Sequence, residues 1–325
     1  MRVLTGKEMK TFEQIVGLSQ PALKTVMRKY LVRKYGIENV KETGDYIIAF
    51  GDIPIALVAH MDTVFKQPAS EIFYDTRKNV IWSPTGLGAD DRAGVFAMVQ
   101  IIKSGLRPHI ILTTDEEIGG IGATMLGKEE CPFEDLRYLI ELDRRGENDC
   151  VFYDCANEEF IDYVETFGFK ESFGSFSDIS MIAPEWEVAA VNLSIGYRDE
   201  HTTSEVLFVS HMFNTIDKVK KMLSEDIEKV RKYNYIPSAY SFNWLNSLKT
   251  DYKKHYACWG CGTYCEREDL FPVKALDGNI DLYCLECATK GNIEWCAICG
   301  EPFEVDPADP DAKICKDCYE EAFRN

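Results

Sequence analysis

Histidine and carboxylate residues suited to binding a metal ion occur in five short blocks of the sequence. In the first block an apolar run, 53–59, ends in His60-Met61-Asp62. Side chains two positions apart on a strand point the same way, so Asp62 can stand beside His60 and orient a metal-bound imidazole. A lone His-x-Asp pair is more often structural, and its meaning here depends on the other blocks.

Three further blocks supply carboxylates, and the last supplies a second histidine. Asp90 follows a glycine-rich turn before a predicted helix, where a carboxylate can bridge two cations. Glu116 and Glu117 follow a buried strand; neighbouring side chains there point different ways, so one can bind metal while the other acts as a base. Asp143 ends another strand, and His201 lies in a loop after the next. Two histidines and several carboxylates suit zinc or a similar divalent ion.

The elements that must position these blocks alternate between strands and helices. This alternation predicts an α/β three-layer sandwich with a mostly parallel mixed sheet. Since ligands bind such sheets at the carboxyl ends of the strands, the five blocks should meet in one cleft. The predicted strands are 45–50, 53–59, 110–114, 138–142 and 188–193, and the predicted helices are 19–35, 91–104, 119–126, 157–166 and 204–232.

The order of the five blocks resembles the co-catalytic dizinc exopeptidase clan, which includes leucyl-aminopeptidase-like enzymes and the acetylornithine deacetylase/carboxypeptidase/tripeptidase group. The resemblance covers roughly residues 37–210. It implies two catalytic divalent ions, a general base that activates a metal-bridging water, and a strained peptide after the bridging aspartate. Carried over to this sequence, the bridging ligand is Asp90, one site is completed by His60 and Asp143, the other by Glu117 and His201, the base is Glu116, and Asp62 supports His60.

The spacing of the blocks favours one branch of this clan. Asp143 and His201 are 58 positions apart, and Asp62 and Asp90 are 28 apart, which leaves no room for an inserted lid domain. The sequence therefore resembles a lidless, zinc-dependent aminopeptidase-like hydrolase acting on a peptide or small amide. Two alternatives stay open: an amidohydrolase or deacylase acting on a non-peptide amide, and a non-enzymatic scaffold whose binding function lies in the tail.

The tail contains four Cys-x-x-Cys pairs, which supply eight thiolates for two structural zinc ions. The intervals favour sequential pairing of the first pair with the second and the third with the fourth, in zinc-ribbon or treble-clef modules; interleaved pairing is the alternative. Zinc would compensate for a core too small to fold alone. The eight residues are Cys258, Cys261, Cys284, Cys287, Cys296, Cys299, Cys315 and Cys318.

Composition limits the partners. The chain has 325 residues, with 36 basic and 54 acidic side chains and a formal charge of −18, which disfavours nucleic acid and anionic membranes. We expect a cytoplasmic protein, because no secretory signal or membrane-spanning run is evident. The predicted domains are a catalytic domain at 1–235, a linker at 236–255 and a zinc module at 256–325, through which a protein partner or a second copy could bind.

Overall fold

The chain forms two compact units, Met1–Ser238 and Ala239–Asn325, which are described separately. The linker predicted at 236–255 lies outside the described residues except for residue 255. The computed structural model describes residues 2–174, 176–226, 230–235, 255–258, 264–266, 270–276, 280–290, 293–297, 302–306, 309 and 312–316.

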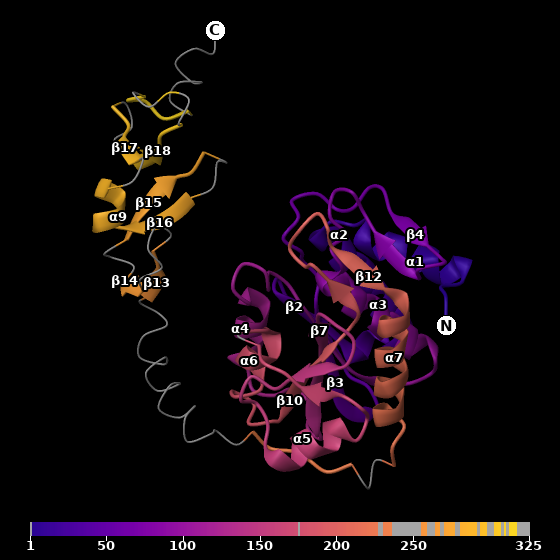
Figure 1. Cartoon of the computed structure of the whole chain (residues 1–325). Coiled ribbons are helices and arrows are strands. Elements are labelled where there is room, and N and C mark those ends of the chain that lie inside the picture. Colours follow the sequence, from indigo (N-terminus) through magenta and orange to yellow (C-terminus); the bar gives the residue numbers. More distant parts are fainter. Residues whose placement is uncertain are drawn as a thin grey trace. The chain divides into compact units, whose positions relative to one another are not determined.

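An eight-stranded sheet lies at the centre of the first unit (Figure 1). Its four middle strands β6, β3, β7 and β10 are parallel, whereas β1, β2 and β8 each pair antiparallel with a neighbour. The mostly parallel mixed sheet is therefore as predicted. In spatial order the strands are β1 (Val40–Glu42), β2 (Tyr46–Ala49), β6 (Pro108–Thr113), β3 (Ile53–His60), β7 (Tyr138–Arg144), β10 (Ala190–Ser194), β8 (Asp149–Val151) and β9 (Lys170–Glu171).

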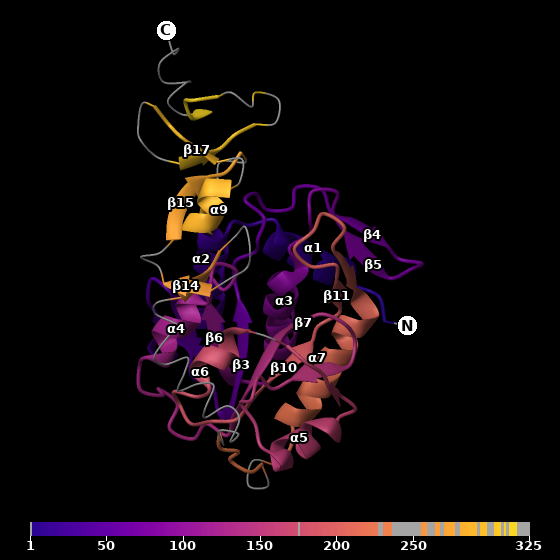
Figure 2. The ribbon, with the colours of Figure 1, turned by 60° about the vertical axis from the view of Figure 1, so that its left-hand side comes forward.

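Helices cover both faces of this sheet, which gives three layers (Figures 1 and 2). All eight residues of β3 are buried, as expected of a strand covered on both sides. Leu57 and Ala59 pack in the larger core with α1, α2, α3, α5 and α7, while Ala56 and Val58 pack in the other core with α4 and α6. The helices are α1 (Gly6–Val16), α2 (Gln20–Tyr35), α3 (Ala89–Lys103), α4 (Ile121–Gly127), α5 (Glu158–Glu165), α6 (Asp178–Ile182) and α7 (Val209–Leu223), with a 3₁₀ turn at Ile37–Asn39.

The ends of several helices follow the capping residues in the sequence. Helix α2 begins after Ser19, carries proline in its first turn and ends at Gly36, whose φ of 91° suits glycine. Helix α5 begins after Asn157, whose side chain accepts the N–H of Phe160 at 3.0 Å. Both helices were predicted at these places.

The long helix predicted at 204–232 is wrong at both ends. Helix α7 begins only at Val209, because Val206–Phe208 forms strand β12 instead, and it ends at Leu223, with Ser224 as its C-cap. This strand pairs with β5, which lies more than 100 residues earlier in the sequence. The second sheet of this unit has the order β11 (Tyr197–Arg198), β12, β5 (Val80–Trp82) and β4 (Phe73–Asp75).

The second unit is built from short strands around two small cores. One core contains Cys258 with Leu270, Val273 and Tyr283, and the other contains Cys296 and Cys315 with two apolar residues. Each core thus includes cysteines from the predicted zinc ligands. The elements are β13 (His255–Ala257), β14 (Tyr264–Glu266), β15 (Leu270–Lys274), β16 (Ile280–Cys284), α9 (Leu285–Lys290), β17 (Ile293–Trp295) and β18 (Pro302–Glu304).

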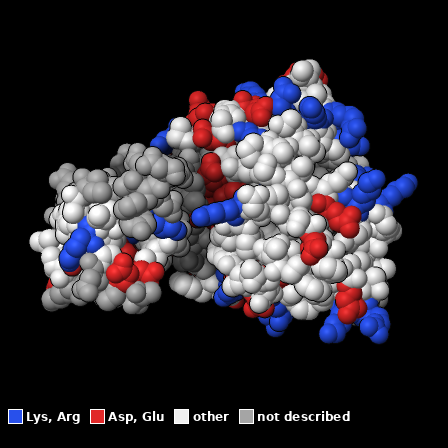
Figure 3. Space-filling view, turned by 90° about the horizontal axis from the view of Figure 1, so that it is seen from above, with Lys and Arg blue, Asp and Glu red and all other residues white. Residues whose placement is uncertain are grey.

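On the face seen in Figure 3, the centre of the first unit is largely uncharged, and most Lys and Arg side chains gather along its margin.

Among the helices of the described part of the chain, none has both the length and the apolar character needed to cross a bilayer.

Candidate metal centre

The structure brings all seven residues predicted for the catalytic site together. His60 ends β3, and Asp143 lies near the end of the parallel neighbour β7. Asp90 lies in the first turn of α3, and the pair Glu116 and Glu117 follows β6. The remaining two are His201, in the loop between β11 and β12, and Asp62, two residues after β3.

Asp90 lies between the two histidines. Its Oδ1 atom is 3.1 Å from Nε2 of His60, and its Oδ2 atom is 3.2 Å from Nε2 of His201. Nε2 of His60 is also 3.6 Å from Oδ1 of Asp143, and Nε2 of His201 is 3.0 Å from Oε2 of Glu117. These distances place Asp90 between a group with His60 and Asp143 and a group with His201 and Glu117, which is the division implied by the resemblance.

Asp62 connects the first block to the third. Its Oδ1 atom is 3.2 Å from Nδ1 of His60, so it can hold the imidazole with Nε2 turned toward Asp90. The same carboxylate accepts the backbone N–H groups of Glu116 and Glu117 at 3.1 and 3.0 Å. Asp62 thus orients a histidine and also fixes the loop that carries the two glutamates.

Glu116 has the surroundings of an acid–base group. Its Oε2 atom is 3.9 Å from Nε2 of His60, beside the group that contains Asp143. Burial raises the pKa of Glu116 to about 7, and the negative charges of Asp178 and Glu117 act in the same direction. A carboxyl group with a pKa near neutrality can both accept and return a proton.

The site has more buried negative charge than its own cations balance. Burial and the charge of Asp90 raise the pKa of Asp143 well above its usual range. Burial acts to raise the pKa of Asp90 as well, but hydrogen bonds from the two histidines hold it below its usual range. Hydrogen bonds to Asp90 and Glu117 raise the pKa of His201 to about 11.

The donor atoms fit divalent cations. Oε1 of Glu117 is buried and has no hydrogen-bond partner, although its other oxygen faces His201. One donor atom each from His60, Asp90 and Glu117 lie within 4.8 Å of one another, so the groups on the two sides of Asp90 adjoin. A divalent cation would balance the buried charge and supply the missing partner of Glu117.

Three polar side chains position Asp143. The amide of Asn192 accepts the backbone N–H of Asp143 and donates to its carbonyl oxygen, both at 2.9 Å. The hydroxyl of Tyr197 donates to Oδ1 of Asp143 at 3.0 Å. Oγ of Ser177, which is 2.6 Å from Oε2 of Glu141, lies 3.3 Å from Oδ2 of Asp143. Asp143 is thus held at its backbone and at its carboxylate.

Glu205 is a functional candidate that the sequence did not reveal. Its buried carboxylate accepts three successive backbone N–H groups, from Gly88 at 2.6 Å, Ala89 at 3.1 Å and Asp90 at 3.0 Å. Glu205 lies four residues after His201. Its hydrogen bonds therefore connect the loop that carries His201 to the turn that carries Asp90, and both residues are predicted to bind the same metal ion. The peptide bond between Asp90 and Asp91 is cis, at the position where the resemblance implies a strained peptide.

In the second unit, three of the predicted zinc ligands lie together. The sulfur atoms of Cys258, Cys284 and Cys287 are all within 4.8 Å of one another. The backbone N–H of Cys284 donates to Sγ of Cys258 at 3.2 Å, and that of Cys315 donates to Sγ of Cys296 at 3.3 Å. The other three predicted ligands, Cys261, Cys299 and Cys318, lie outside the described residues.

Comparison with known proteins gives similarity of structure only. No protein-family model matches the sequence, and no curated protein matches it. A tripeptidase from Staphylococcus aureus is similar with a TM-score of 0.57 and 14% identity, over 70% of this chain and 100% of that one. An aminopeptidase from the archaeon Desulfurococcus kamchatkensis is similar with a TM-score of 0.53 and 15% identity, over 69% of this chain and 98% of that one. The matched part of this chain therefore has the same fold as these solved structures.

Proposed function

We propose that this protein is a metal-dependent aminopeptidase whose two divalent ions share Asp90. The observation that carries the proposal is the position of this carboxylate, with one oxygen toward His60 and the other toward His201. Asp143 would complete the first site and Glu117 the second. Zinc suits this mixture of imidazole and carboxylate ligands.

In the reaction, the residues of the chain have distinct roles. When bound, a pair of divalent ions would supply Lewis-acid chemistry, lowering the pKa of a water molecule and stabilising an oxyanion. Glu116 accepts the proton of the attacking water at its carboxylate and returns it to the leaving amine. Asp62 keeps Nε2 of His60 directed toward Asp90, and the hydroxyl of Tyr197 holds Asp143.

A peptide is the preferred substrate for two reasons. The similar solved structures are a tripeptidase and aminopeptidases, which favours a peptide bond over a non-peptide amide. The described core also lacks an inserted domain between Asp143 and His201. These two residues are 58 positions apart, and the segment between them forms only short strands and helices of the first unit. A free amino terminus would then reach the site without a lid.

The test combines activity with metal content. Purified protein is assayed on a library of short peptides with free and acetylated amino termini, and its bound metal is measured on the same sample. We expect removal of single amino-terminal residues from the free peptides, loss of activity with a chelator, and recovery with zinc. Glu116→Gln should retain its metal and lose activity by about 10²–10⁴-fold. Full activity of this variant would contradict the role of Glu116.

We also propose two structural zinc ions in the second unit, with sequential cysteine pairing. The proximity of Cys258, Cys284 and Cys287 supports the first site. The hydrogen bond between Cys315 and Cys296 supports the second, because it brings the third and fourth pairs together. Small cores that contain cysteine are usual where metal binding supplies folding energy.

A further inference from the structure

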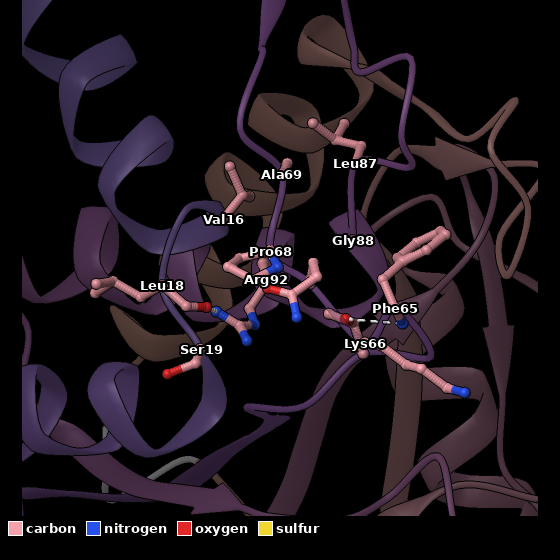
Figure 4. A pocket seen from close by; sticks show the side chains of 12 residues that line it. Val16, Leu18, Ser19, Phe65, Lys66, Pro68, Ala69, Leu87, Gly88 and Arg92 are labelled. Atoms are coloured by element: carbon pink, nitrogen blue, oxygen red, sulfur yellow. Dashed lines mark hydrogen bonds between the residues drawn. The ribbon is translucent and has the colours of Figure 1, made fainter. Parts of the chain in front are cut away.

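A cavity of about 60 Å³ lies behind the loops that carry Asp62 and Asp90. Its walls come from the turn between α1 and α2, the loop after β3 and the loop before α3, and Arg92 of α3 points into it (Figure 4). A cavity needs roughly 10–15 Å³ to hold one water molecule, so this one has room for a small ion.

Arg92 is a buried cation with donors to spare. Its side chain is 3% exposed, and its Nη1 atom donates to the backbone carbonyls of Ile15 and Leu18 at 2.7 and 3.0 Å. Its Nε atom is buried without a hydrogen-bond partner. In Figure 4 the guanidinium points toward Leu18 and Ser19, the latter an exposed residue of the cavity wall.

The nearest acidic side chains do not pair with this guanidinium. No carboxylate oxygen of the described residues lies within 4.0 Å of it. The oxygens of Asp91 accept the N–H groups of His60 and Gly94, at 3.3 and 2.9 Å. Those of Asp62 accept from Glu116 and Glu117 and contact His60. The negative charges of Asp62 and Asp91 favour the charged guanidinium from beyond this distance, but burial still lowers the pKa of Arg92 to about 10. An anion in the cavity would lower the remaining cost of burying this charge.

We propose that the cavity is a binding site for a small monovalent anion, a halide or a short carboxylate, held by the guanidinium of Arg92. Lys66 is exposed at the rim and extends away from Arg92 in Figure 4, so it is not part of the proposed contact. Charge-assisted hydrogen bonds from the free guanidinium donors would hold the anion. The metal ligands take no part in this site.

Anion binding is measured on the full-length protein after a chelator has removed the exchangeable metal of the first unit and left the cysteine-bound zinc of the second unit in place. The readout is a shift of the urea unfolding midpoint of the first unit, so that the result does not depend on any enzymatic activity. Sodium acetate is compared with sodium gluconate at equal ionic strength and pH 7, because gluconate has the same charge and is too large for the cavity. We expect a saturable rise of the midpoint with acetate alone. Equal shifts with both salts, or no shift with acetate, would overturn the proposal.

Three variants assign the effect to the cavity. Arg92→Met should abolish the acetate-specific rise, and Ala69→Val, which adds bulk to the cavity wall, should weaken apparent acetate affinity at least about tenfold. Lys66→Met is the matched control and should retain the full rise. An acetate-specific rise that persists in Arg92→Met, or one that is lost in Lys66→Met, contradicts the assignment.

A crystal soaked in sodium bromide provides a readout that does not depend on the folding of Arg92→Met. The expected result is an anomalous peak within hydrogen-bonding distance of the Arg92 guanidinium. An ordered cavity that holds only water under these conditions would overturn the proposal, whatever the activity of the enzyme.

Discussion

The carboxylate of Glu205 accepts the backbone N–H of Asp90 at 3.0 Å, and it also holds the two preceding N–H groups. These hydrogen bonds hold the backbone at Asp90 and so fix the direction in which the Asp90 side chain points. Because Glu205 is only four residues after His201, its hydrogen bonds also fix the distance between the loop that carries His201 and the turn that carries Asp90. The geometry of the shared carboxylate thus depends on a residue that does not touch the candidate metal positions.

Replacing Glu205 should weaken metal binding without removing a ligand. Glu205→Ala leaves three backbone N–H groups without their acceptor, and we expect it to lower the affinity for at least one metal equivalent by about 10–100-fold. Glu205→Gln keeps one acceptor oxygen and should have a smaller effect. Metal affinity is measured by competition with a chelator, and Glu200→Gln is the control, because Glu200 pairs with Arg145 near the surface. Equal losses of metal affinity in Glu200→Gln and Glu205→Gln would mean that the negative charge of these residues, rather than the hydrogen bonds of Glu205, supports metal binding.

His109 should make the folded state sensitive to acid. Its Nδ1 atom accepts the N–H of Gly51 at 3.0 Å and its ring stacks on Phe133, with 4.3 Å between centroids. Burial lowers the pKa of His109 to about 4 from an ordinary value of 6.5. Between these values the unfolded chain binds more protons, so stability falls as the pH drops from 6.5 to 4 and the effect is fully developed below 4.

His109→Gln removes this dependence, because glutamine can still accept the N–H of Gly51 but does not titrate. Between pH 7 and pH 4 we expect the wild-type protein to lose roughly 3 kcal/mol more unfolding free energy than the variant. The measurement is urea unfolding of the first unit in both full-length proteins across this range, with exchangeable metal removed from the first unit and the cysteine-bound zinc retained. Parallel pH profiles for the two proteins would show that His109 is not the titrating group.

The cysteine pairing can be read from zinc counts in double variants. Under sequential pairing, Cys258→Ser with Cys284→Ser disrupts one site and should remove one zinc equivalent. Cys258→Ser with Cys315→Ser disrupts both sites and should remove two. Under interleaved pairing, Cys258→Ser with Cys296→Ser would remove only one equivalent, whereas sequential pairing predicts two.

The candidate site could be predicted because its residues are of distinctive types at strand ends. His60, Asp143 and Glu117 each lie at the end of, or a few residues after, a mainly apolar run long enough to identify a buried strand. Parallel strands place their carboxyl ends at one edge, so proximity in space follows from the pattern. The central strands and α2 could be predicted for the same reason, since their signals are local.

What could not be predicted depends on contacts between distant segments. Strand β12 is an apolar run directly before a helix, and it is a strand because it pairs with β11 on one side and with the distant β5 on the other. Glu205 bonds to backbone N–H groups, which every residue but proline has, so no motif marks its partners. The short helix α1 was missed although Thr5 and Glu8 form a capping box, a local signal that could have revealed it.

The most direct test of the central claim is a crystal structure of the zinc-loaded protein with anomalous scattering measured at the zinc edge. The account predicts two peaks in the first unit, about 3.5–4 Å apart, one beside each oxygen of Asp90. One peak should have His60 and Asp143 as its neighbours, and the other His201 and Glu117. A single peak, or two that do not share Asp90, would contradict the dinuclear site.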